Sequence, residues 1–187
     1  QLKQTLFKKI DLGCENTNWF KHKKLNSIFI KINGMSSELL PGVSTSPWVF
    51  EAVLQHVRKH FPMTRIYFGD SDGYGVRQVD KMVENWGYLP IADKYNAHFV
   101  NLSKDKKVKV RIGNVFGTQS LPKTLLDVDA IVNLPVGKTH GLSTMTAAMK
   151  NLWGLLPEIR YKFHPVIHDA IAELNLFFDK VVLNVCD

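Results

Sequence analysis

The sequence predicts an α/β fold in which a mainly parallel sheet is flanked by helices and carries a short antiparallel excursion. Short runs rich in β-branched and aromatic residues alternate with stretches in which apolar residues recur every three or four positions. Such alternation is typical of strand–helix–strand units, whose right-handed crossovers make successive strands parallel. Because no repeat or Pro/Gly/Ser-rich linker divides the 187 residues, we expect a single α/β domain over residues 1–187.

The first strand and helix are predicted from their composition and from their end signals. Residues 27–33 form a β-branched and aromatic run that stops before Gly34, which indicates a strand followed by a loop. After this loop, Ser46 and Pro47 provide an N-cap and a first-turn proline. Apolar residues then recur at helical spacing until Phe61, so we expect a helix here.

The middle of the chain contains a second strand–helix unit and an antiparallel pair. Residues 64–70 form the strand, residues 71–75 a turn rich in Gly and Asp, and residues 76–86 the helix. Strand-like alternation then occurs in residues 97–102 and again in residues 108–112, with a charged turn between them. We expect these two segments to pair with each other as the antiparallel excursion.

The last third of the sequence predicts two further strands and two helices. Residues 128–134 form a strand of the buried type, and residues 181–185 form another. A helix between them begins at His164, and an earlier helix has the apolar stripe Met145, Ala148, Met149, Leu152 and Trp153. Because an apolar strand runs to Asp187 without a turn, we expect the domain to be truncated at its C-terminal end.

Composition narrows the classes of partner. The formal net charge of +7 favours anionic partners, since it raises their local concentration. The lysines occur in short dispersed groups, without an aromatic-interleaved basic motif or zinc-finger spacing, so we expect no nucleic-acid partner.

The apolar content and the two cysteines give information about membrane association and the cellular compartment. No run of about 18 apolar residues offers a spanning helix, so we expect no membrane partner. Cys14 and Cys186 stand far apart, which favours reduced thiols over a disulfide framework. These features predict a soluble, cytoplasmic protein.

Polar residues follow the predicted strands at the points where the strands end. In open parallel sheets, ligands bind beyond the carboxyl ends of the strands. Lys31 and Asn33 end the first strand, Asp70 and Ser71 end the second, and Asn133 ends the strand at residues 128–134. We therefore expect these five side chains to line one crevice and to contact a ligand there.

The segment after residues 128–134 combines a cation, an imidazole and a flexible backbone. Lys138, Thr139, His140 and Gly141 lie between a predicted strand and a predicted helix, whose N-terminal N–H groups favour an anion. Lys150 lies on that helix and adds a second cation. We expect Lys138 and Lys150 to supply charge and His140 to act as an acid, a base or a ligand. The alternative is a surface loop with a solvated lysine.

Two familiar site patterns are absent or weak. A nucleotide-binding loop needs glycine at the position of Val132, so we exclude it. Asp70 and Asp72 fit paired carboxylates and a backbone-capping role equally well.

The histidines give a less specific signal. His164 and His168 are four apart, which suits one metal ion, but no acidic residue lies between them as in the zinc protease motif. We assign no metal site and expect His168, on the same side as Asn175, to act as an acid, a base or an orienting group. The remaining histidines are interpreted as surface or structural residues: His22, His56, His60 and His98.

Several blocks of sequence, taken together, resemble the family called domain of unknown function 362. The blocks are Ile30-Lys31-Ile32-Asn33, Thr45-Ser46-Pro47, Gly69-Asp70-Ser71, Asn133-Leu134-Pro135, Lys138-Thr139-His140-Gly141, Ala147 with Lys150-Asn151-Leu152 and Gly154, and His168 to Ala172 with Leu174. The resemblance covers most of the chain, which corresponds to the N-terminal portion of family members. It also implies that Asn151 is a ligand-binding residue. This sequence departs from the family pattern at Ile32, where proline is usual, and at Val136, where lysine is usual.

The resemblance implies redox or metal-centre biochemistry, because members of this family are often joined to a ferredoxin-like segment that binds [4Fe–4S] clusters. Two distant cysteines cannot hold such a cluster, so we expect no iron–sulfur cluster within this chain, and other cofactors stay open. Our leading hypothesis is a domain that binds a small anionic ligand, a carboxylate or phosphate ester, in a metal- or redox-linked enzyme. The alternative is a non-catalytic accessory module that docks to an iron–sulfur or redox protein partner.

Overall fold

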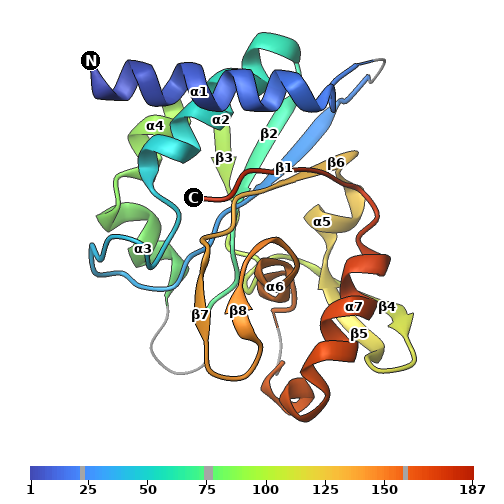
Figure 1. Cartoon of the computed structure of the whole chain (residues 1–187). Helices are drawn as coiled ribbons and strands as arrows, with labels where there is room; N and C mark the ends of the chain where they lie inside the picture. The colour runs from blue at the N-terminus through green and yellow to red at the C-terminus, as the bar shows by residue number, and fades with distance from the viewer. Residues whose placement is uncertain (22–23, 74–77, 158–159) are drawn as a thin grey trace.

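The computed structural model describes residues 1–187 except 22–23, 74–77 and 158–159, and it confirms the α/β prediction (Figure 1). Within the described residues, five strands form one sheet in which every neighbouring pair is parallel. In spatial order the strands are β3 (Ala97–Phe99), β2 (Arg65–Gly69), β1 (Ser27–Lys31), β6 (Ala130–Asn133) and β9 (Val181–Asn184).

The central strand β1 supplies side chains to both faces of the sheet. Ile28, Ile30 and Ile32 are fully buried in one core, and Phe29, which points the opposite way, is fully buried in a second core. A strand covered on both faces needs a continuous apolar run, which is what the sequence of β1 provides.

Helices cover each face of the sheet (Figure 1). One face carries α1 (Leu2–Thr17), α2 (Pro47–His60), α3 (Val79–Asn85) and α4 (Tyr88–Lys94). The opposite face carries α5 (Lys123–Asp127), the 3₁₀ helices η1 (Leu152–Leu155) and η2 (Tyr161–Val166), and α7 (Ile167–Phe177).

The N-cap and the first-turn proline predicted for α2 are confirmed. The Ser46 hydroxyl accepts a hydrogen bond from the Val49 N–H at 3.3 Å, and Pro47 is the first helical residue. The helix ends at His60, before Phe61. The start predicted for α3 at residue 76 lies outside the described residues, and α3 itself begins at Val79.

The antiparallel excursion exists, but its predicted pairing was wrong. Residues 97–99 form β3, which joins the edge of the parallel sheet beside β2. The strand β4 (Lys107–Gly113) pairs instead with β5 (Gly117–Pro122), which follows it directly in the chain. Gly117 has φ 62°, a left-handed conformation that glycine adopts at low cost, so a local turn can close this hairpin.

The helix predicted over residues 145–153 was wrong in its first part. Residues 138–140 form β7 (Lys138–His140), which pairs antiparallel with β8 (Thr144–Thr146), and only the short α6 (Ala148–Asn151) follows before η1. Threonines are frequent in these two strands, and β-branched residues suit strands better than helices. Met145 and Met149 are consequently exposed, at 58% and 53%.

The last helix begins later than predicted. His164 and Pro165 lie inside η2, and α7 begins at Ile167. Val166 ends the 3₁₀ helix and is 46% exposed.

Two further sequence expectations can be compared with the structure. Cys14 is a buried free thiol and Cys186 an exposed one. Helices long and apolar enough to cross a bilayer do not occur in the part of the chain that the structure describes.

Candidate functional site

The carboxyl ends of three neighbouring strands lie in register. Lys31, the last residue of β1, is paired with Gly69 of β2 on one side and with Asn133 of β6 on the other. Asn133 is in turn paired with Asn184 of β9. The polar residues that end these strands therefore meet at one edge of the sheet.

A buried ion pair forms the base of this edge. Lys31 is fully buried, and its ammonium lies 2.9 Å from Oδ2 of Asp70, which is also buried. The Asp70 carboxylate accepts two backbone hydrogen bonds as well, from Gly34 at 2.9 Å and from Ser71 at 2.7 Å. These contacts involve both carboxylate oxygens and tie the ends of β1 and β2 together.

Gly154 closes over the ion pair. A Cβ atom at this position would lie 2.3 Å from Oδ1 of Asp70 and 2.7 Å from Nζ of Lys31, so no larger residue fits without displacing the pair. The Gly154 carbonyl accepts a hydrogen bond from the Ser71 hydroxyl at 2.6 Å. These contacts hold η1 against the end of β2.

Four amide side chains form a second polar structure, which we call the asparagine chain: Asn33, Asn151, Asn133 and Asn184. Asn33 donates to Asn151 at 2.7 Å, and Asn151 donates to Asn133 at 2.8 Å. Asn133 donates to Asn184 at 2.8 Å and to the Ala148 carbonyl at 2.9 Å. Three of these amides are buried, so the hydrogen bonds of the asparagine chain satisfy polar groups that burial would otherwise leave without partners.

Lys138 is held at the end of the asparagine chain. Its ammonium donates to Oδ1 of Asn33 at 2.9 Å and also to the Val43 carbonyl. These two hydrogen bonds fix the position of the ammonium. Thr45, which is fully buried, accepts from the Asn33 N–H at 2.8 Å and fixes the loop that carries Val43.

His140 is oriented by the backbone of the turn between β7 and β8. Its Nδ1 accepts hydrogen bonds from the N–H groups of Leu142 at 3.1 Å and Ser143 at 3.2 Å. A nitrogen that accepts carries no proton, so in the neutral ring the proton is on Nε2. The turn ends at Thr144, whose φ of 62° is strained for a β-branched residue.

Positive charge surrounds His140. Burial lowers the pKa of its imidazole below the ordinary value of 6.5, and the charges of Lys150, His164 and Lys138 lower that pKa further. Burial likewise lowers the pKa of His164, with smaller effects from Lys150 and Arg160. We call this group of five side chains the cationic rim: Lys138, His140, Lys150, Arg160 and His164.

Trp153 connects two members of the rim. The Lys150 ammonium lies 5.0 Å from the centre of its ring, and the His164 ring stacks on it at 5.9 Å with an interplanar angle of 11°. Lys138 and His140 lie on β7 and Lys150 lies on α6, and β8 contacts both of these elements (Figure 1).

Sequence reasoning missed Arg160 and misjudged His164. The Arg160 guanidinium donates to the Ser71 hydroxyl at 2.5 Å, to the Leu156 carbonyl at 2.6 Å and to the Asp72 carbonyl at 3.2 Å. Nothing in the spacing of the sequence ties Arg160 to residues almost ninety positions earlier. His164 was paired with His168, but His164 lies in the 3₁₀ helix η2 and His168 lies in the α-helix α7, so the two residues do not share one α-helical face.

The other predicted site residues lie outside this network. Thr139 and Gly141 are exposed on the β7–β8 hairpin, and His168 is exposed on α7. Asp72 caps the backbone, since its Oδ1 accepts from the Val79 N–H at 2.9 Å. The helix N-terminus expected next to Lys138 is replaced by the hairpin, so the positive charge here comes from side chains.

Comparisons with known proteins agree with the fold. A family model described as "Domain of unknown function (DUF362)" matches residues 28–187. The thylakoid-associated protein sll1697 of Synechocystis is 32% identical over 113 residues, which is 60% of this chain and 33% of that protein. A crystal structure of a Thermotoga maritima protein superposes with a TM-score of 0.54 at 10% identity, over 98% of this chain and 50% of that one. The chain thus spans a third to a half of the length of these relatives.

Proposed function

The chain belongs to the DUF362 family, and we propose that it binds a small anionic ligand, a carboxylate or a phosphate ester, at the cationic rim. The observation that supports this proposal is the placement of two lysines, Lys150 and Lys138, and a second imidazole, His164, close enough to His140 to lower its pKa. Charges of one sign repel one another, and a bound anion relieves that repulsion.

The members of the rim have different roles in the proposal. His140 offers the Nε2–H as a directed hydrogen-bond donor, because its Nδ1 is occupied by two backbone N–H groups. Lys150 provides charge that lies over the Trp153 ring, while Lys138 provides charge that is fixed in place by Asn33. In an enzyme, the same groups would stabilise negative charge that develops on a substrate, with the His140 Nε2–H as a hydrogen-bond donor to that charge.

The proposal is tested by calorimetric titration of citrate and glycerol 3-phosphate into the wild-type chain and two lysine variants. We expect Lys150→Met to weaken binding about tenfold, since one charge near a surface site contributes about 1 kcal/mol or more. The matched control is Lys9→Met, which removes the same charge from the exposed side of α1 and should leave the affinity unchanged. Equal losses in the two variants would mean that only net charge matters, and the proposal would fail.

A second candidate function is docking to a redox or iron–sulfur protein. It is supported by five exposed apolar side chains on the same segments as the cationic rim: Leu142, Met145, Met149, Tyr161 and Val166. The name of the Synechocystis relative, a thylakoid-associated protein, also suits a chain that attaches to other components. Exposed apolar patches of this kind mark interaction surfaces.

A further inference from the structure

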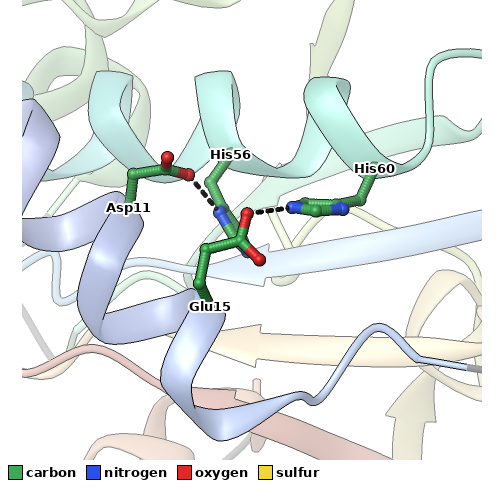
Figure 2. A group of neighbouring side chains, drawn as sticks. All are labelled: Asp11, Glu15, His56 and His60. Carbon is green, nitrogen blue, oxygen red and sulfur yellow. Dashed lines mark hydrogen bonds and ion pairs between the residues drawn. The ribbon is translucent and has the colours of Figure 1, made fainter.

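A second group of chemically reactive side chains lies far from the rim, between α1 and α2 (Figure 2). Asp11 and Glu15 are one turn apart on α1, and His56 and His60 are one turn apart on α2. The two pairs face each other, and one ligand atom from each residue lies within 4.8 Å of all the others.

Each histidine is matched to one carboxylate. His56 Nδ1 lies 2.7 Å from Oδ1 of Asp11, and His60 Nε2 lies 2.7 Å from Oε1 of Glu15. The two rings are adjacent, with their centres 4.7 Å apart. Two imidazole nitrogens and two carboxylate oxygens form a ligand set that Zn²⁺ accepts in proteins.

A cation already occupies part of this space. The Lys59 ammonium lies 2.9 Å from Oδ2 of Asp11 and 2.7 Å from Oε1 of Glu15. The Lys59 side chain is 51% exposed, and its flexible stem lets the ammonium move into solvent. The carboxylates are therefore arranged around positive charge that a metal ion can replace.

We propose that Asp11, Glu15, His56 and His60 bind a divalent transition-metal ion of the Zn²⁺ class, and that Lys59 is its competitor. Bonds of about 2.0–2.1 Å place tetrahedral ligand atoms about 3.3 Å apart. The two hydrogen-bonded pairs, at 2.7 Å, must therefore separate by about 0.6 Å, and the longest distances, up to 4.8 Å, must shorten by up to about 1.5 Å. Side-chain rotation on two adjacent helices supplies that movement without a change of fold.

Trp19 contacts the His56 nitrogen that faces away from Asp11. Its indole N–H donates to His56 Nε2 at 3.1 Å, which leaves the proton of the neutral ring on Nδ1, the nitrogen that faces Asp11. A metal ion on Nδ1 moves that proton to Nε2, so the indole loses its acceptor. Metal binding therefore changes the environment of the Trp19 indole.

This site is independent of the anion proposal. Asp11 and Glu15 lie outside residues 28–187, which the family model matches, whereas His56 and His60 lie within them, so the site joins α1 to the matched region. A bound ion would link α1 to α2 and raise the stability of the chain, by an amount that grows with the logarithm of the ion concentration above the Kd.

The experiment titrates Co²⁺ and Zn²⁺ into the wild-type chain and three variants, with Co²⁺ absorption and thermal unfolding as readouts. We expect the wild type to give saturable d–d bands of a tetrahedral nitrogen–oxygen site and a Zn²⁺-dependent rise in Tm. His60→Gln should abolish both signals, and Lys59→Met should bind Zn²⁺ about tenfold more tightly, because the competing charge is gone. The matched control His98→Gln removes an exposed histidine of β3 and should behave as wild type.

Four outcomes would overturn the proposal: no saturable bands in the wild type, bands that persist in His60→Gln, equal loss in His98→Gln, or unchanged Zn²⁺ affinity in Lys59→Met. Lys59→Met retains both histidines and both acids, so it tests the site even if His60→Gln is destabilised. Far-UV circular dichroism of each variant shows that the comparison is made between folded proteins.

Discussion

Lys31→Met is expected to lower the free energy of unfolding by about 3–5 kcal/mol, because removing one member of a buried ion pair leaves an uncompensated charge. Lys31 is fully buried, and Asp70 would keep only its two backbone hydrogen bonds. Urea denaturation at neutral pH measures the difference. The control Lys109→Met removes an exposed lysine of β4 and should change stability by less than about 0.5 kcal/mol.

A double variant separates the ion pair from simple loss of packing. Lys31→Met combined with Asp70→Asn leaves no buried charge, so it should be more stable than the sum of the two single losses predicts. Strict additivity of the two losses would show that the two charges do not interact. A loss of unfolding free energy below about 1 kcal/mol for Lys31→Met would contradict the burial of Lys31 as a charged group.

Asn151→Leu is expected to have the second-largest effect, a loss of about 2–4 kcal/mol. Asn151 accepts from Asn33 and donates to Asn133, so its replacement leaves one buried donor and one buried acceptor unsatisfied, at about 1–3 kcal/mol each. Thermal and urea unfolding measure the loss.

The matched control for this variant is Asn85→Leu, on the exposed end of α3, where the lost hydrogen bond to the Ser37 carbonyl should cost less than about 1 kcal/mol. A similar cost for the two variants would show that the asparagine chain contributes no more than a surface hydrogen bond.

The parallel core of the sheet could be predicted from the sequence because its strands are buried on both faces. The runs that became β1, β2 and β6 are continuous and apolar or aromatic, and such runs need no knowledge of distant contacts to be recognised. Once they are parallel, the polar residues that end them must gather at one edge of the sheet.

The hairpin of β7 and β8 could not be predicted with the same rules. Lys138, Thr139 and His140 have no hydrophobic alternation, because the hairpin lies outside the main sheet and buries little of its surface. The spacing of Met145 and Met149 resembled a helical stripe, yet both side chains are exposed. Periodicity indicates structure only where one face of a segment is covered.

The group between α1 and α2 was missed for a different reason. His56 and His60 were interpreted as surface or structural residues, and no element was predicted for residues 2–17. Asp11 and Glu15 lie about 45 positions from the two histidines, and only the packing of α1 on α2 brings them together.

The most direct test of the cationic rim is a ¹⁵N NMR titration of the histidine rings with citrate. The free chain should show His140 protonated on Nε2, with a pKa below 6.5, since burial and the charges of Lys150, His164 and Lys138 disfavour the imidazolium. Citrate should shift the His140 Nε2–H signal and raise the His140 pKa, while exposed His98 on β3 should not respond. A His140 signal that is unchanged at saturating citrate, or a His98 signal that moves as much, would contradict an anion site at the rim.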